Sequence, residues 1–340
     1  MDCRISPRGD RGMQDRYNKK FLIKVCKLYY FDAWTQEKIA AKFGVSRPII
    51  SKALQKAREE GIVEIVIHDD EYEVLELEET LEKEFGLTEA IVVPTRDIAD
   101  EMIYGVVGRT AAQYVSRAVR SAKRIGVSWG MTLYHTVKEF SSENREDVKV
   151  IPLVGGMGAT KIELHSNQIA YELSKKLNGH CESLYSPAIV ESAELREMLA
   201  KVPNIASVLE EGKKCDVALV GIGNPFARST MEETGYVSRN ELEELKAHGV
   251  VGDINSFFIE ADGRPSGHPI NRRVIGIGLD HLKKIKNVIG IAFGLYKVDS
   301  ILATLRGGYL NVLITDHSTA AQVIRNWEQF KRQSPTVSLG

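Results

Sequence analysis

The stretch WTQEKIAAKFGVSRPIISKALQKAREEG, residues 34–61, determines how the N-terminal part of the chain folds. Thr35 and Ser46 are suitable N-caps, because a side-chain hydroxyl can accept a hydrogen bond from an unpaired backbone N–H of the first helical turn. Pro48 is tolerated in a first turn, and Gly44 can adopt the left-handed conformation that ends a helix. The stretch therefore predicts two short helices joined by a tight turn.

Each predicted helix has an apolar side and a polar side. The apolar positions recur at helical spacing and are Ile39, Ala40, Phe43, Ile50, Leu54 and Ala57. The polar side of the second helix carries cationic, amide and hydroxyl groups, which form hydrogen bonds with base edges in the DNA major groove. We therefore predict a helix-turn-helix DNA-binding motif. The alternative is an ordinary pair of antiparallel helices inside a larger helical domain.

The predicted DNA contacts lie on these two helices and at their first turns. They are Thr35, Gln36, Ser46, Arg47, Pro48, Ser51, Lys52, Gln55 and Lys56. The formal net charge of the chain is −1, so DNA binding requires a local basic region. Such a region precedes the motif and contains Arg4, Arg8, Arg11, Arg16, Lys19, Lys20, Lys24 and Lys27.

The segments flanking the motif complete a small domain. Phe21, Val25, Leu28 and Tyr29 recur at helical spacing and predict a preceding helix. Residues 62–68 alternate apolar and polar side chains and predict a short structural strand. We therefore predict a DNA-binding domain over residues 16–70, preceded by a disordered lead-in over residues 1–15.

An acidic amphipathic helix is predicted next, over residues 71–85. Its apolar side carries Val74, Leu77, Leu81 and Phe85. We assign residues 71–88 to a linker helix, which either simply connects two domains or pairs with its copy in a dimer.

Strands and helices alternate through the rest of the chain. Strands are predicted at residues 90–93, 124–127, 148–154, 217–220, 288–292 and 312–314, and helices at 102–119, 133–140, 167–176, 242–247, 299–305 and 318–329. One further helix, at residues 198–210, has no assigned place in the sheet order. This alternation predicts an α/β domain over residues 89–332, with a mostly parallel sheet covered by helices on both faces.

The composition is that of an ordinary globular protein, with 43% hydrophobic and 27% charged residues among 340. The four cysteines, Cys3, Cys26, Cys181 and Cys215, are too widely separated for a zinc or redox motif and are predicted to be free thiols. Neither a membrane-spanning apolar run nor a signal-peptide pattern is evident. We therefore expect a cytoplasmic protein without a metal or cofactor.

Small and polar residues follow several predicted strands. Ligands of open α/β sheets bind outside the carboxyl ends of the strands, where glycine permits close approach and helix N-termini attract anions. Three such loops contain Ser128, Trp129, Gly130, Met131 and Thr132; Gly155 and Gly156; and Gly221 and Gly223. A glycine after a strand is more often a turn device, but three such loops in one sheet favour a ligand site.

Charged candidates for the same site come from two later segments. Asp253 and Asn255 lie in a predicted loop, where a carboxylate could accept hydrogen bonds from sugar hydroxyls. Lys297 follows a strand and could place a positive charge beside a phosphate. Helix capping for the acid and a solvated surface position for the lysine are the alternatives.

Catalytic motifs are not evident in the sequence. The histidines are scattered, without metal-ligand spacing or a local Ser-His-Asp pattern, and the GxxxxGK[ST] phosphate loop is missing. We therefore predict that the protein is not an enzyme.

Six segments in order resemble the SorC family of sugar-binding bacterial transcriptional regulators, of the sorbitol/sorbose-operon regulator type. They are LYYFDAWTQEKIAAKFGVSRPIISKALQKAREEGIV, IGVSWGMTL, IPLVGG, DVALVGIG, GVVGDINSFF and LRGGYLNVLITDHSTA, spread over residues 21–324. The resemblance implies a large domain similar to ribose-5-phosphate isomerase and glucosamine-phosphate deaminase folds, used for sensing. It also implies a homotetramer or dimer that binds operator DNA and responds to a sugar, polyol or sugar-phosphate effector.

The resemblance assigns the effector site to the loops at the strand ends. The predicted effector-binding residues are Ser128, Trp129, Gly130, Met131, Thr132, Gly155, Gly156, Asn167, Gly221, Gly223, Asp253, Asn255 and Lys297. Val154 stands where some relatives have lysine or arginine, which favours a monophosphate or an unphosphorylated polyol over a bisphosphate. The predicted function is regulation of a carbohydrate or polyol operon. A sugar-phosphate isomerase or deaminase with Asp253 as base, and a non-specific nucleoid protein, are the alternatives.

Overall fold

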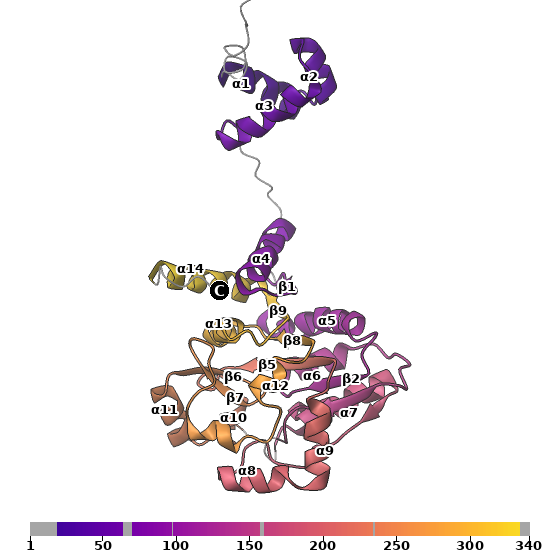
Figure 1. Ribbon diagram of the computed structural model, residues 1–340, viewed down its shortest axis with the longest axis vertical. Helices are drawn as coiled ribbons and strands as arrows, with labels where there is room; N and C mark the ends of the chain where they lie inside the picture. The colour runs from indigo at the N-terminus through magenta and orange to yellow at the C-terminus, as the bar shows by residue number, and fades with distance from the viewer. Residues whose placement is uncertain (1–18, 64–69, 97, 157–159, 234, 334–340) are drawn as a thin grey trace, which may run out of the picture. The chain divides into compact units, whose positions relative to one another are not determined.

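The computed structural model describes residues 19–63, 70–96, 98–156, 160–233 and 235–333 (Figure 1). Its contacts divide the chain into two compact units, residues 1–68 and 69–340, which are described separately. The predicted lead-in and most of the predicted strand at residues 62–68 lie outside the described residues. Among the described helices, none is long and apolar enough to cross a membrane.

The described part of the smaller unit, residues 19–63, contains three short α-helices around one apolar core. They are α1 (Lys19–Cys26), α2 (Gln36–Phe43) and α3 (Arg47–Glu59), with a π-helical turn at Lys27–Phe31. The fully buried side chains include Leu22, Val25, Ile39 and Ile50. Helical spacing of these residues in the sequence is what brings them together on the inner side of each helix.

The turn between α2 and α3 is built as the sequence predicts, with one exception at a cap. Thr35 accepts a hydrogen bond from the backbone N–H of Lys38 (3.3 Å), and Gly44 adopts φ 65°. Ser46 occupies the N-cap of α3 as predicted, but its side chain makes no capping hydrogen bond.

The larger unit is built on a parallel sheet in the order β1-β9-β8-β5-β2-β3-β4. The strands are β1 (Glu89–Val93), β2 (Arg124–Val127), β3 (Lys149–Pro152), β4 (His180–Cys181), β5 (Val217–Gly223), β8 (Asn287–Ile291) and β9 (Val312–Asp316). An antiparallel hairpin of β6 (Val250–Ile254) and β7 (Phe257–Glu260) pairs with the end of β5. The predicted mostly parallel α/β architecture is confirmed, whereas the resemblance to the isomerase and deaminase folds stays a prediction.

Helices cover both faces of this sheet (Figure 1). One face carries α5 (Asp100–Ala118), α6 (Met131–Glu139) and α7 (Ser166–Leu177). The other carries α4 (Asp70–Phe85), α9 (Pro203–Gly212), α12 (Leu279–Leu282), α13 (Val298–Arg306) and α14 (His317–Gln333). The strands are apolar on both sides because each face is buried beneath helices.

The remaining elements lie around the hairpin and in connections. They are α8 (Ala193–Ala200), α10 (Thr230–Glu233), α11 (Arg239–Ala247) and the 3-10 turns Ile162–Leu164, Pro269–Arg273 and Leu295–Lys297. The predicted single helix at residues 198–210 is two helices, α8 and α9. Pro203 occupies the first turn of α9, where its missing N–H breaks the preceding hydrogen-bond ladder.

The predicted linker helix α4 packs against the larger unit. Leu81 is fully buried there, and Phe85 contacts the ring of Trp327 on α14 (centroids 5.3 Å apart). Glu84 accepts hydrogen bonds from Trp327 Nε1 and Lys331 Nζ (2.6 Å each). The apolar side predicted from the sequence therefore contacts the parallel-sheet unit of its own chain.

Candidate ligand-binding site

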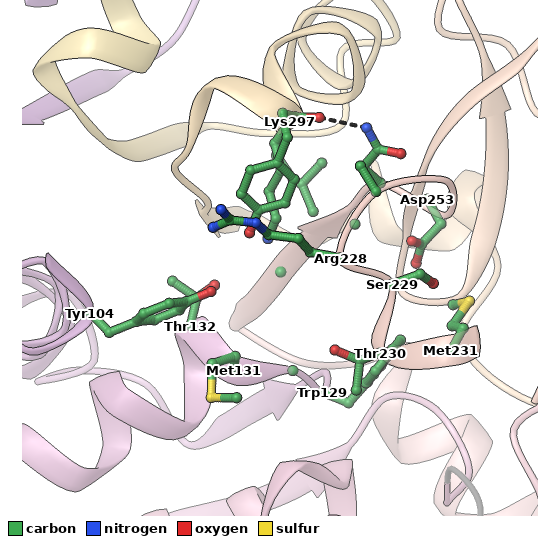
Figure 2. A pocket seen from close by; sticks show the side chains of 17 residues that line it. Tyr104, Trp129, Met131, Thr132, Arg228, Ser229, Thr230, Met231, Asp253 and Lys297 are labelled. Carbon is green, nitrogen blue, oxygen red and sulfur yellow. Dashed lines mark hydrogen bonds between the residues drawn. The ribbon is translucent and has the colours of Figure 1, made fainter. Parts of the chain in front are cut away.

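A pocket lies at the carboxyl ends of β8, β5 and β2, three neighbouring strands of the parallel sheet. It is formed by the loops that follow these strands, at residues 129–132, 224–231 and 296–297, with Tyr104 of α5 and Asp253 of β6 (Figure 2). This edge is where open α/β sheets place their ligands, because backbone N–H groups and loop side chains converge there.

The pocket is small and polar. Its volume is about 70 Å³, room for roughly five water-sized groups. Thr132, Arg228, Ser229, Asp253 and Lys297 contribute polar side chains to its wall. The hydroxyl and charged groups of this pocket match those of a polyol, part of which would fill the volume.

Asp253 reaches the pocket from a strand, so its predicted position in a loop is wrong. The residue lies in β6 and is only 4% exposed. The strand turns immediately afterwards at Asn255 (φ 52°) and Ser256 (φ 66°), two left-handed residues suited to a two-residue hairpin. The hairpin therefore fixes the carboxylate through the backbone.

Asp253 and Lys297 influence each other's protonation. Loss of hydration on burial raises the pKa of Asp253 to about 6, against the opposing attraction of Lys297. Burial likewise lowers the pKa of Lys297 to about 8, although its side chain remains partly accessible. At neutral pH the pocket therefore presents one carboxylate and one ammonium group, partly stripped of water and available to ligand hydroxyls and anions.

Arg228 and Tyr296 form a second polar group on the pocket wall. The guanidinium of Arg228 lies 5.3 Å from the centre of the Tyr296 ring, and Lys297 Nζ lies 5.8 Å from it. Burial and a hydrogen bond with Tyr104 raise the pKa of Tyr296, so its phenol is neutral. The ring therefore holds two cations near the pocket without neutralising them.

The structure brings part of the predicted effector site together. The predicted residues that line the pocket are Trp129, Gly130, Met131, Thr132, Gly221, Gly223, Asp253 and Lys297. Five predicted residues do not line the pocket and have structural contacts within the protein instead. They are Ser128, Gly155, Gly156, Asn167 and Asn255.

Ser128 and Asn255 connect elements behind the pocket. Ser128 Oγ donates to Asn255 Oδ1 (2.8 Å), and both residues are buried. The amide of Asn255 also donates to the carbonyls of Leu153 (3.2 Å) and Ile277 (3.0 Å). All of these groups have hydrogen-bond partners within the protein, so both residues have a structural role, and their contact with the effector stays a prediction.

The Gly155–Gly156 loop and Asn167 also have structural contacts. A Cβ at Gly155 would lie 2.4 Å from the carbonyl oxygen of Pro187, so the glycine permits two backbones to pack closely. Asn167 donates to the carbonyl of Leu184 (3.0 Å) and accepts from its N–H (2.8 Å). The glycine that follows this strand, Gly155, therefore marks a place where two backbone segments of the protein pack closely.

Several residues of the pocket escaped the sequence analysis. They are Tyr104, Ala227, Arg228, Ser229, Thr230, Met231 and Tyr296. Ile222 and Asn224 also line the pocket and belong to the predicted loop at Gly221 and Gly223, although they were not among the predicted contacts. Tyr104 comes from α5, and only the packing of that helix on the sheet brings it here.

The smaller unit presents the predicted DNA contacts on its surface. All but Gln36 and Lys56 are exposed, and those two are half-buried. Arg47 pairs with Glu37 (3.0 Å), Gln55 donates to Glu59 (2.9 Å), and Lys56 pairs with Glu60 (3.6 Å). These exposed partners are weakly held, so the polar groups of α3 can exchange them for DNA.

The chemical groups of the pocket suit binding. In the part of the chain that the structure describes, His, Cys, Asp and Glu side chains form no cluster of three that could hold a metal ion. Asp253 and Lys297 can orient hydroxyls and an anionic group, and Ser229 and Thr132 can add hydrogen bonds.

Comparisons with known proteins place this arrangement among transcriptional regulators. The profile of a family described as "Putative sugar-binding domain" matches residues 70–325. The deoxyribonucleoside regulator of Bacillus subtilis is 32% identical over 92% of this chain and 99% of its own length.

Solved structures give the same result. The full-length sorbitol operon regulator SorC of Klebsiella pneumoniae has a TM-score of 0.72 and 31% identity, and the match covers 90% of this chain and 98% of that one. A DeoR family transcriptional regulator from Listeria monocytogenes has a TM-score of 0.70 and 42% identity, with coverage of 74% and 99%.

Proposed function

Because the chain belongs to the SorC family of sugar-binding transcriptional regulators, we propose that it controls a carbohydrate or polyol operon through a small effector bound beside Asp253 and Lys297. The observation that carries this proposal is that a buried carboxylate, Asp253, and an ammonium group, Lys297, line the same pocket at the carboxyl ends of the central strands.

The effector is a tetritol or pentitol, its monophosphate, or a sugar of similar size. Asp253 accepts hydrogen bonds from its hydroxyls, and Lys297 binds a phosphate or a hydroxyl oxygen. Arg228 is a second cation on the same wall and can bind the same anion. Val154, which stands where some relatives have a lysine or arginine, is fully buried and does not line the pocket. The cations of the pocket lining are therefore Lys297 and Arg228.

The DNA-binding part is the helix-turn-helix of α2 and α3. Its exposed contacts are Arg47, Ser51, Lys52 and Gln55 from α3 and Thr35 at the start of α2, with the half-buried Gln36 beside Thr35. Arginine and lysine bind guanine edges or phosphates, and glutamine binds adenine. Residues 16–70 constitute this domain and residues 89–332 the effector domain.

Control operates as a shift between two arrangements of a homodimer or homotetramer. The effector binds one arrangement more tightly than the other, and the two arrangements space the paired DNA-binding domains differently. The pocket binds its ligand without catalysing a reaction of it, consistent with relatives that are named as regulators. A cytoplasmic location stays a prediction.

The test combines DNA binding and effector binding in one purified protein. Promoter fragments flanking the gene are titrated by fluorescence anisotropy, with and without tetritols, pentitols, hexitols and their phosphates. We expect at least one compound to change the affinity for one fragment. Absence of any preferred fragment, with a steep salt dependence, would support a non-specific nucleoid protein instead.

Two variants separate the proposed sites. Arg47→Gln should weaken fragment binding and leave effector binding, measured by calorimetry, unchanged. Lys297→Met should weaken effector binding and leave fragment binding without effector unchanged. Release of product from an aldose phosphate in the same samples would contradict the assignment as a pure sensor.

A further inference from the structure

A second, larger cavity lies beside the proposed effector pocket. Its volume is about 590 Å³, against about 70 Å³ for the first. Tyr104, Arg228 and Tyr296 line both cavities and form the wall between them. The second cavity lies at the carboxyl ends of β1, β9 and β8 and has no role in the proposed function.

One side of this second cavity is apolar. Ile98, Ile103, Phe293 and Leu295 line it, and Leu295 is 61% exposed at its rim. An apolar or aromatic part of a ligand would remove this surface from water. A bare polyol would leave these four side chains without a matching group.

The other side combines a buried carboxylate with hydroxyls. Asp316 is 5% exposed and accepts from the backbone N–H of Gly294 (3.3 Å) and from Thr95 Oγ1 (3.5 Å). Both contacts are long, so the carboxylate retains capacity to accept hydrogen bonds from ligand hydroxyls. Ser318 adds a further hydroxyl.

Two arginines supply positive charge to the same cavity. Arg228 lies over the Tyr296 ring, and Arg96 pairs with Glu73 of α4 (2.6 Å). His317 Nε2 approaches the second carboxylate oxygen of Glu73 (3.1 Å). The side chains of Arg96 and Glu73 are 51% and 43% exposed, so water screens their attraction and a ligand anion can replace Glu73.

We propose that this second cavity binds a nucleoside monophosphate or a similar hydroxylated anion with an apolar ring. Its phosphate forms an ion pair with Arg96 and replaces Glu73 as the partner of that arginine. The ring lies against the apolar side, the ribose hydroxyls donate to Asp316, and the phosphate accepts from Arg96 and Arg228. All three kinds of group in the cavity then have a partner.

Binding at this position would loosen the start of α4. Glu73 is the fourth residue of α4, at the end of its first turn, and α4 is the first described helix after the smaller unit. Arg96 cannot serve the phosphate and Glu73 equally, so ligand binding and anchoring of this turn oppose each other. By linkage, the ligand weakens the anchor by the same factor by which the formed anchor weakens ligand binding.

The experiment measures AMP binding to the full-length protein by calorimetry, with adenosine and ribose 5-phosphate as its two halves. We expect AMP to bind more tightly than either half. Lys297→Met should retain AMP binding, because Lys297 lines only the first cavity. AMP binding that disappears in Lys297→Met would assign the ligand to the first pocket and overturn the proposal.

Two variants that break the same ion pair provide the sharpest comparison. Arg96→Gln should weaken AMP binding about tenfold or more, whereas Glu73→Gln should strengthen it about threefold. Arg109→Gln is the matched control, since the exposed Arg109 also pairs with a glutamate (Glu139, 3.3 Å) but lines neither cavity. Equal effects of Arg96→Gln and Glu73→Gln would show that the pair is only structural.

Hydrogen exchange of the same samples tests the link to α4. AMP should accelerate exchange of the first two turns of α4 in the wild type and have little further effect in Glu73→Gln. Unchanged exchange on saturation with AMP would refute the competition for Arg96.

Discussion

Gly223 and Asp253 lie opposite each other where β5 pairs with β6, and a Cβ at position 223 would lie 2.0 Å from Oδ1 of Asp253. This separation is far shorter than van der Waals contact, so the carboxylate can occupy its observed place only beside glycine. The glycine therefore acts on the pocket through the acid that it accommodates.

Gly223→Ala should accordingly displace the Asp253 carboxylate and weaken effector binding about tenfold or more, a loss of about 1.4 kcal/mol. The loss of affinity is measured by calorimetry, with the effector that the titrations with tetritols, pentitols, hexitols and their phosphates identify. Gly267→Ala is the control, because a Cβ there meets no atom within 4 Å. Normal affinity in Gly223→Ala would remove Asp253 from the list of effector contacts.

The raised pKa of Asp253, about 6 against an ordinary value of 3.8, makes folding pH-dependent. Between these values the folded state binds more protons than the unfolded state, so this group lowers stability as pH rises. Asp253→Asn removes the effect. From pH 4 to pH 7 the unfolding free energy of Asp253→Asn should increase relative to wild type, by up to about 3 kcal/mol. Urea titrations of both proteins at each pH test this, and a constant difference would contradict burial of the charge.

The lowered pKa of Lys297, about 8, predicts a second pH effect, on effector affinity. An anionic effector needs the protonated amine, which is lost as pH rises through 8. Affinity for a polyol phosphate should therefore fall about tenfold from pH 7 to pH 9, where the charge of the phosphate is constant. Lys297→Met should bind weakly and without this pH dependence. A pH-independent affinity in the wild type would exclude contact between Lys297 and the anion.

Gly155→Ala and Gly156→Ala should differ although the residues are adjacent. A Cβ at Gly155 would meet two carbonyl oxygens at 2.4 and 2.5 Å, whereas the nearest atoms to one at Gly156 are 3.9 Å away. We expect Gly155→Ala to lose more than about 2 kcal/mol of stability and Gly156→Ala to stay within about 0.5 kcal/mol of wild type. Thermal unfolding measures this, and the affinity of the folded protein for effector should be unchanged in both variants.

The two N-caps of the DNA-binding helices provide a further comparison. Thr35 accepts a capping hydrogen bond and Ser46 does not. Thr35→Ala should therefore destabilise α2 by about 1 kcal/mol, whereas Ser46→Ala should destabilise α3 by only a few tenths. Hydrogen exchange of the α2 and α3 amides in the full-length chain reports the local stability. Equal acceleration in both helices would show that Ser46 caps α3 in solution.

The sequence was sufficient for features that depend on local periodicity. Helical spacing of Ile39, Ile50 and Leu54 predicted two helices with a shared core, and apolar runs such as residues 217–220 predicted buried parallel strands. It failed where a single residue interrupts a pattern, as Pro203 does between α8 and α9, and where a polar residue continues a strand, as Asp253 does in β6.

The sequence by itself determined the fold class, six of the strands of the parallel sheet and the loops that follow the central strands, because these depend on neighbours within a few positions in the chain. It missed β4 and the β6–β7 hairpin. Only the tertiary structure decided which loop residues meet. Tyr104, Arg228 and Tyr296 line the pocket. Gly155 and Asn255 instead contact other parts of the protein. The physical reason is that a binding site is made by packing between segments far apart in the chain, which no local pattern records.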